Sequence, residues 1–162
     1  MTADFFHGYA LNAVDTKNRL SIPAEFRDVI AARSGSKDLY LGPATGIDCL
    51  IGYDKSHATK LQARLDAQDV DEDTAEGAFR STFLFGSVVP LKIDDAGRIV
   101  LTAGIRDLGD ITTHAWFVAG GNWFQVWNPY RYLEQSGIDA RMFRILRREM
   151  EAKGLPAIEA SR

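Results

Sequence analysis

At 162 residues the chain suits one or two domains, and its 46% apolar and 25% charged residues are ordinary for a globular protein. Its formal charge of −3 argues against an indiscriminate, histone-like binder of nucleic acid, although it is compatible with a local basic patch. The single Cys49 excludes an intramolecular disulfide and a cysteine-rich zinc site, so we expect it to be a small core residue. The N-terminus lacks the basic and apolar regions of a signal peptide, and no stretch approaches the roughly 20 apolar residues of a membrane helix. We therefore expect a cytoplasmic protein.

The first half of the chain alternates short apolar stretches with turn residues. Pro23 suits the first turn of a helix, and Asp54 is a candidate N-cap for a second helix. The acidic segment 66–73 separates that helix from a third. The apolar stripe of the third helix consists of Ala75, Phe79, Thr82 and Phe83. The expected strands are 5–14, 19–22, 39–41 and 48–53, and the expected helices are 24–32, one that follows Asp54, and 74–83.

The second half repeats this order and then adds helices. Pro90 marks the strand 87–93 as an edge or bulged strand, because proline cannot donate a ladder hydrogen bond. The sequence Gly-Gly-Asn at 120–122 predicts a hairpin between two strands. Asn128, followed by Pro129, and Asp139 are helix-start signals. The remaining expected elements are strands at 98–101, 115–119 and 123–127, a short helix at 103–108, and a last helix that stops at Gly154.

Two stretches of the chain match each other at a constant offset. DTKNRLSIPAEFR begins at Asp15, and DDAGRIVLTAGIR begins 79 residues later at Asp94. This alignment pairs Asn18 with Gly97 and Arg19 with Arg98. Its other pairs are Leu20 with Ile99, Ile22 with Leu101, Phe26 with Ile105, and Arg27 with Arg106. A repeat of this period indicates two copies of one structural unit, and we expect the two units to share a core.

The paired stretches both begin with a turn. Asn18 and Gly97 are residues that readily adopt a positive φ, so each predicts a left-handed residue at the fourth position of its turn. Asp15 and Asp94 open the turns, where an aspartate can accept hydrogen bonds from main-chain N–H groups ahead of it. The arginine that follows each turn is then fixed in direction. The pattern indicates a tight loop that exposes an arginine, built twice.

No arrangement typical of an enzyme or a metal site occurs in the sequence. His7, His57 and His114 lie far apart, and the chain has no HExxH, GxSxG, GxxxxGK[ST] or GxGxxG motif. Asp94 and Asp95 could form an acid–base pair, but adjacent side chains diverge on a strand, and the first copy has Asp15 followed by threonine. We expect no catalytic activity, metal, cofactor or small-molecule substrate.

Basic residues on the turns are better functional candidates. Lys17 and Arg19 lie on the first turn, and Lys92 and Arg98 lie on or beside the second. Lysine and arginine on a rigid loop can contact phosphates, and arginine can bind guanine through two hydrogen bonds. Taken singly, these side chains would be ordinary solvated charges. The recurrence of the same arginine after the same turn favours nucleic-acid binding.

A second basic group lies on the last expected helix. Its stripe consists of Arg141, Arg144 and Arg148 and opposes an apolar stripe of Phe143, Leu146 and Met150. The basic stripe is compatible with a solvated helix face, with a contact to the DNA backbone, or with a contact between subunits. These alternatives stay open at the level of sequence.

These motifs together resemble the MraZ family over nearly the whole chain. The resemblance rests on Phe6-x-Gly8, on DTKNR followed by LSIPAEFR, on DDAGR followed by IVLTAGIR, and on FVAGGNWFQVWNPYRY. It implies an α+β fold in which two AbrB-like swapped-hairpin half-domains form a pseudo-twofold β-barrel with peripheral helices. The implied half-domains are 5–53 and 84–127, with connecting helices at 54–83 and C-terminal helices at 128–155. The implied function is sequence-specific DNA binding as a nucleoid-associated, ring-shaped homo-oligomer on tandem promoter repeats, as a repressor of a division and cell-wall gene cluster that includes its own promoter.

The resemblance also suggests roles for individual residues. Lys17, Asn18, Arg19 and Arg98 are the implied DNA contacts, and Asp15, Asp94 and Gly97 are the implied turn-forming residues. The family usually has glycine where this chain has Asn18, so the added amide could contact DNA. Because the second turn has Ala96 where the first has Lys17, we expect the first turn to contribute more charge. The alternative is an oligomeric protein-interaction module that does not bind DNA.

Overall fold

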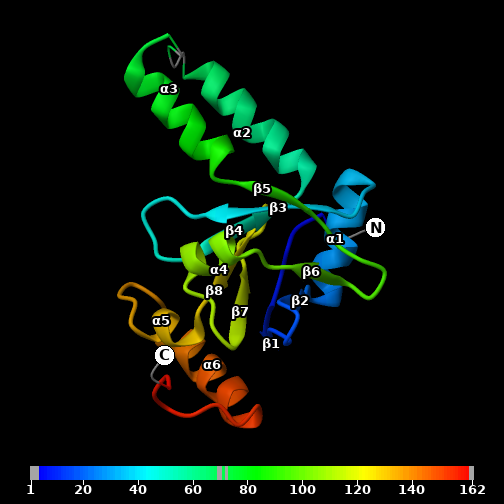
Figure 1. The fold of residues 1–162 in the computed structure, drawn as a ribbon, viewed down its shortest axis with the longest axis vertical. Helices are drawn as coiled ribbons and strands as arrows, with labels where there is room; N and C mark the ends of the chain where they lie inside the picture. Colours follow the sequence, from blue (N-terminus) through cyan, green and yellow to red (C-terminus); the bar gives the residue numbers. More distant parts are fainter. Residues whose placement is uncertain (1–3, 69–70, 72, 161–162) are drawn as a thin grey trace.

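The fold is a mixed α+β architecture built on an antiparallel sheet (Figure 1). The computed structural model describes residues 4–68, 71 and 73–160. A six-stranded sheet has the order β1-β7-β8-β4-β3-β5, and β2 and β6 form a separate two-stranded sheet. The strands of the larger sheet are β1 (Tyr9–Ala13), β3 (Asp38–Pro43), β4 (Leu50–Tyr53), β5 (Val89–Lys92), β7 (His114–Ala119) and β8 (Phe124–Trp127).

The strand order has an internal twofold relation. Exchanging the first repeat's β1, β3 and β4 with the second repeat's β5, β7 and β8 reverses the order of the sheet and leaves every neighbour unchanged. The first strand of each repeat pairs with the hairpin of the other repeat: β1 with β7, and β5 with β3. The repeat seen in the sequence is therefore present as two intertwined units. β5, which contains Pro90, is an edge strand, as the proline predicts.

The β2–β6 ribbon consists of β2 (Arg19–Ser21) and β6 (Arg98–Val100), which lie side by side although they are distant in sequence (Figure 1). β2 lies against β1, and β6 lies against β5. Only an isolated bridge between Val14 and Leu20 links β1 to β2, so the ribbon covers the open side of the sheet without a continuous ladder. Among the described residues the strands do not close into the expected barrel, because the turns at 15–18 and 94–97 redirect the chain between the sheet and the ribbon.

The helices begin largely where the sequence places their caps. Asp54 accepts a hydrogen bond from the N–H of Ser56, and Asn128 accepts from the N–H of Tyr130. The helix expected at 74–83 is shorter as an α-helix, because it changes at Thr82 into a π-helical turn. The helices are α1 (Ala24–Ser34), α2 (Lys55–Ala67), α3 (Ala75–Ser81), η1 (Thr82–Gly86), α4 (Ala103–Gly109), α5 (Pro129–Leu133) and α6 (Ala140–Ala152). None of the helices within the described ranges has the length and apolar character needed to cross a membrane.

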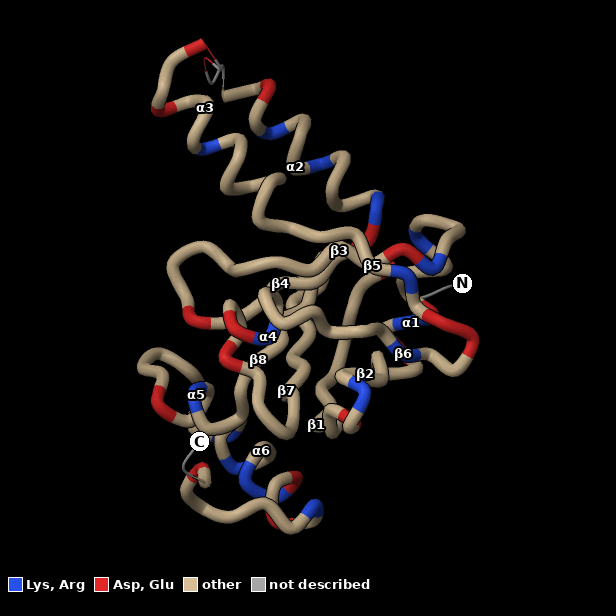
Figure 2. Tube along the Cα trace, in the orientation of Figure 1, with Lys and Arg blue, Asp and Glu red and all other residues tan. Residues whose placement is uncertain are grey.

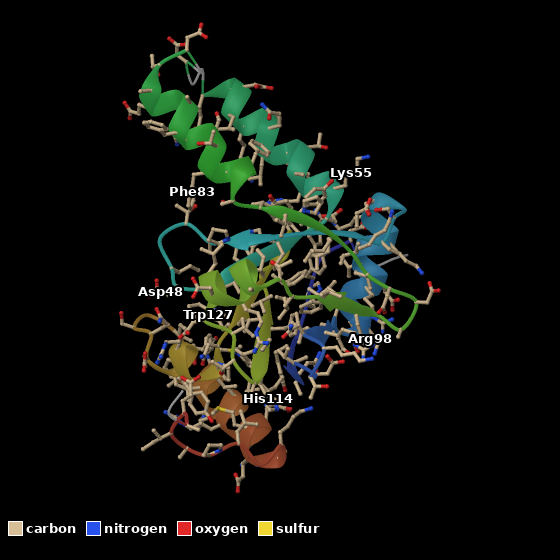
Figure 3. All side chains as sticks on the ribbon, viewed as in Figure 1. Asp48, Lys55, Phe83, Arg98, His114 and Trp127 are labelled. Atoms are coloured by element: carbon tan, nitrogen blue, oxygen red, sulfur yellow. The ribbon has the colours of Figure 1, made fainter. Side chains whose placement is uncertain are left out.

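Helix α2 leads away from the sheet and α3 returns toward it, so the pair projects from one end of the molecule (Figure 1). The predicted apolar stripe of α3 does not enter a core: the side chains of Phe79 and Phe83 are 72% and 46% exposed. Phe83 lies at the base of this projection (Figure 3). Within the acidic segment between the helices, Asp69 and Glu72 lie outside the described residues.

Two apolar clusters cover opposite faces of the larger sheet. On β7, the adjacent residues Trp116 and Phe117 point to different clusters, as alternate residues of a strand do. The main cluster contains all six paired apolar residues of the repeat, so the two repeats share one core as predicted: Leu20, Ile22, Phe26, Ile99, Leu101 and Ile105. The second cluster includes Leu146 and Met150 of α6 together with Cys49, which is buried as expected.

Candidate nucleic-acid interface

The first turn, residues 15–18, is ordered by one carboxylate. Oδ1 of Asp15 accepts hydrogen bonds from the N–H groups of Lys17 at 2.9 Å and Arg19 at 2.8 Å. The N–H of Asn18 donates to the main-chain oxygen of Asp15 at 3.0 Å, and Asn18 has a φ of 61°. This is the left-handed conformation that asparagine tolerates better than most residues. The turn therefore fixes the backbone from which the Arg19 side chain leaves.

The second turn, residues 94–97, has the same hydrogen bonds. Oδ1 of Asp94 accepts from the N–H groups of Ala96 and Arg98, both at 2.9 Å. The N–H of Gly97 donates to the main-chain oxygen of Asp94 at 2.9 Å, and Gly97 has a φ of 81°. The two turns thus have the same conformation despite different sequences, because the aspartate and the left-handed residue occupy the same positions.

The two arginine side chains are held near these carboxylates to different degrees. Nε of Arg19 donates to Oδ2 of Asp15 at 2.7 Å. Nε of Arg98 lies 3.4 Å from Oδ2 of Asp94 and makes no aligned hydrogen bond. A guanidinium has five N–H donors, so both ion pairs leave the terminal nitrogens of each arginine for another acceptor. The side chains of Arg19 and Arg98 are 30% and 32% exposed, which makes those nitrogens accessible.

The hydrogen bonds also keep both turn carboxylates charged. The N–H of Arg19 is the largest cause of a lowered pKa for Asp15, and the Arg19 side chain lowers it further. The N–H of Arg98 likewise lowers the pKa of Asp94, with the Arg98 charge as a weaker cause. At neutral pH each carboxylate therefore balances part of the charge on its arginine until a stronger anion approaches.

The register of the β2–β6 ribbon places both arginines on one face. Arg19 pairs with Val100, and Ser21 pairs with Arg98. Leu20 and the residue opposite it, Ile99, point the other way into the core. Arg19 and Arg98 are diagonal neighbours, a relation that places such positions about 7–8 Å apart. Basic and acidic positions of the turns gather at this side of the molecule (Figure 2), and Arg98 lies here in the side-chain view (Figure 3).

Each turn is also joined to the other repeat. The N–H of Leu101 donates to the main-chain oxygen of Asn18 at 2.8 Å, and the N–H of Ile22 donates to that of Gly97 at 2.9 Å. These bonds are equivalent under the offset of 79 residues. They fix the position of one turn relative to the other, so the two arginines act from a single rigid surface.

Arg27 and Arg106 extend this cross-connection, although sequence reasoning assigned them no role. The guanidinium of Arg106 donates to Oδ1 of Asn18 at 2.5 Å and to the main-chain oxygen of Ile111 at 3.2 Å. Nε of Arg27 donates to the main-chain oxygen of Ile22 at 3.1 Å, and its guanidinium lies over Gly97, where an added Cβ would be 2.6 Å from Cζ. Each helix arginine therefore lies against the turn of the other repeat. Their recurrence at the repeat offset was the available signal.

The two turns differ in charge. Lys17 is exposed on the first turn, and Ala96 occupies the equivalent position of the second. Asp95 stands where the first turn has Thr16, and it forms an exposed ion pair of 3.0 Å with Lys37. The predicted charge difference between the turns is thus present in three dimensions, with the second turn more acidic.

The remaining candidate residues lie away from this surface. Arg141, Arg144 and Arg148 are exposed on α6, which packs against β1, and Arg141 is paired with Asp139 at 2.6 Å. Lys92 of β5 lies 3.8 Å from Asp38. Across the described part of the chain, no three His, Cys, Asp or Glu side chains gather into a possible metal site.

Comparison with known proteins gives a consistent set of relatives. A protein of Beijerinckia indica named transcriptional regulator MraZ is 33% identical over 153 residues, which cover 93% of this chain and 90% of that protein. The transcriptional regulator MraZ of Methylocella silvestris is 31% identical over the same shares of both chains. That of Rickettsia felis is 32% identical over 75% of this chain and 80% of its own length. No protein-family model matches the sequence.

Proposed function

The chain belongs to the MraZ family of transcriptional regulators, and from this premise we propose that it binds promoter DNA through the two turns and the β2–β6 ribbon. The supporting observation is the pair of aspartate-ordered turns that place Arg19 and Arg98 on one exposed face. The relatives are named regulators and not enzymes, which points to a protein without catalytic activity.

The ribbon has dimensions suited to a DNA groove. The major groove of B-DNA is about 12 Å wide and admits a two-stranded β-ribbon. Arg19 and Arg98, about 7–8 Å apart, would reach base edges within one binding site and bind guanine bidentately. Lys17 would contact a phosphate, because it is exposed on the first turn. Asn18 would contact DNA only if it released Arg106, to which its side-chain oxygen is bound.

The proposed architecture is an AbrB-like swapped hairpin repeated in one chain. The exchanged pairings of β1 with β7 and of β5 with β3 support this assignment. The half-domains are 5–53 and 84–127, with 54–83 and 128–155 as helical additions. In this arrangement Asp15, Asp94 and Gly97 serve to form the turns, and their hydrogen bonds and φ support that role.

A ring-shaped homo-oligomer would explain how a net-acidic chain binds DNA firmly. One ribbon with two arginines makes few contacts, whereas several ribbons on repeats one helical turn apart, about 10 base pairs, gain from a high effective concentration. The exposed Phe79 and Phe83 support the existence of a subunit interface. The protein would act as a cytoplasmic, nucleoid-associated repressor of a division and cell-wall gene cluster that includes its own promoter.

The same exposed phenylalanines favour the second candidate function, an oligomeric interaction module without DNA binding. The two functions differ in their dependence on salt. DNA binding through Lys17, Arg19 and Arg98 releases counterions, so the affinity would fall steeply as salt is raised. An apolar assembly would not respond in this way.

Titration of the DNA upstream of its own gene by the wild type, Arg19→Ala and Arg98→Ala proteins tests the proposal. Each bidentate arginine contact contributes about 1–3 kcal/mol, so we expect at least about a tenfold loss of affinity in each variant. Arg144→Ala is the matched control, since it removes an exposed arginine away from the ribbon. Wild-type affinity in both ribbon variants would refute the assignment. Absence of any salt-dependent binding by intact oligomers would favour the interaction module.

A further inference from the structure

Val100 is an apolar side chain in the middle of the charged ribbon surface. It is the last residue of β6, it is 56% exposed, and it points to the same side as Arg19 and Arg98. A single exposed apolar residue needs no functional explanation by itself. Two further observations concern this one: its position relative to the arginines, and its departure from the internal symmetry.

The position follows from the strand register. Val100 lies directly across from Arg19, a relation that places two Cβ atoms ~4.5–5.5 Å apart. Arg98 lies two residues before Val100 on the same strand and the same face, ~6–7 Å away. A side chain placed there reaches the same groove floor as the two guanidinium groups, within about two base-pair steps of each.

The departure from symmetry follows from the repeat. Position 100 corresponds to position 21 under the offset of 79 residues, and the first repeat has Ser21 there. The other outward residue of each strand is an arginine, and the inward residues are both buried aliphatic side chains. The outward face of the ribbon is therefore symmetric in charge but differs at this one pair, where one half has a hydroxyl and the other an isopropyl group.

We propose that Val100 is a specificity-determining residue that contacts the C5-methyl group of a thymine in the major groove, next to the base bound by Arg19. This inference rests on the proposed function. The thymine methyl is the one apolar group in the major-groove pattern of the bases, and aliphatic side chains recognise it by contact. Ser21 would instead face a hydrogen-bonding base edge at the symmetry-related position. The chain thus distinguishes the two halves of a pseudo-symmetric site, and each operator repeat has a defined direction.

The test is a scan in which each dT of the tandem repeats upstream of the gene is replaced, at the same place in every repeat, by dU, which lacks only the methyl group. Burial of one such carbon is worth about 0.8 kcal/mol, so we expect one position at which the wild-type affinity falls about fourfold for each repeat engaged. Val100→Ser should bind the dT and dU forms of that site equally. Ser21→Val should gain a second dU-sensitive position on the other half of the repeat.

The outcomes separate this inference from the function beneath it. Both substitutions are at exposed positions, and equal melting temperatures would exclude misfolding as the cause of any change. Salt-dependent binding in which Val100→Ser retains the wild-type dU profile, or in which no dU position matters, would overturn the thymine contact alone. Failure of the wild type to bind the duplex would refute the proposed function and the inference with it.

Discussion

Arg106→Ala should destabilise the protein more than Arg27→Ala, although the repeat makes the two positions equivalent. Arg106 donates to three acceptors: Oδ1 of Asn18, and the main-chain oxygens of Ile111 and Thr112. Arg27 donates to one, the main-chain oxygen of Ile22. The comparison therefore tests the cross-repeat contacts against an internal standard within the same fold.

The expected magnitudes follow from these bonds. A hydrogen bond from a charged donor contributes about 1.5–3 kcal/mol, but an exposed acceptor regains water when the donor is removed. Asn18 is exposed and would lose little, whereas the acceptors at Ile111 and Thr112 lie beside the core. We expect about 3 kcal/mol for Arg106→Ala and about 1 kcal/mol for Arg27→Ala. In a chain of this size that corresponds to melting temperatures lower by about 6–12 °C and about 2–4 °C.

Thermal and urea unfolding at one fixed protomer concentration would measure both values, since an oligomer's stability depends on concentration. Arg106→Lys is a useful third variant, because lysine keeps the charge but cannot reach several acceptors in fixed directions. It should fall between the wild type and Arg106→Ala. Equal losses in Arg106→Ala and Arg27→Ala, or a larger loss in Arg27→Ala, would refute the reasoning.

Three further predictions concern charge and burial. Asp95→Thr removes an exposed negative charge beside the ribbon and should tighten DNA binding about two- to threefold at low salt, with less gain at high salt; filter binding without any gain would contradict this. Because the pKa values of Asp15 and Asp94 are lowered on folding, their stabilisation is present above the unfolded pKa near 3.9 and is lost as the pH falls through the folded value. Melting curves from pH 7 to pH 2.5 should thus show a shallower acid decline for Asp15→Asn than for the wild type, and parallel curves would count against the turn hydrogen bonds. Burial raises the pKa of the Cys49 thiol to about 12, so an aromatic disulfide reagent at pH 8 should label it only after unfolding; rapid labelling of the native protein is the contrary result.

Much of the local structure follows from short stretches of the chain. Asp15 and Asp94 order their turns by hydrogen bonds to residues two and four positions ahead, which needs no partner from elsewhere. Asp54 caps α2 in the same local way. Pro90 excludes its strand from the centre of a sheet through its own missing N–H group. The repeat likewise made the shared core predictable, since apolar residues that recur at matched positions must be buried by matched surroundings.

Other features were decided only by contacts between distant segments. The apolar spacing around Phe79 is the same for a buried and an exposed helix face, and only the projection of α2 and α3 from the sheet leaves that side chain in solvent. The expected barrel depended on continuous pairing at the ends of the ribbon, where the structure has an isolated bridge at Val14. Arg27 and Arg106 reach across the repeats, so their partners cannot be found from neighbouring residues.

The surface proposed to bind DNA combines both kinds of information. The sequence by itself determined that two turns of one kind each hold an arginine, because an aspartate and a left-handed residue act over only four positions. The register between β2 and β6 was settled by the tertiary structure, and a shift of one residue would turn the side chains of one strand to the opposite face. Burial of Leu20 and Ile99 in the common core selects the register that directs Arg19, Arg98 and Val100 outward together.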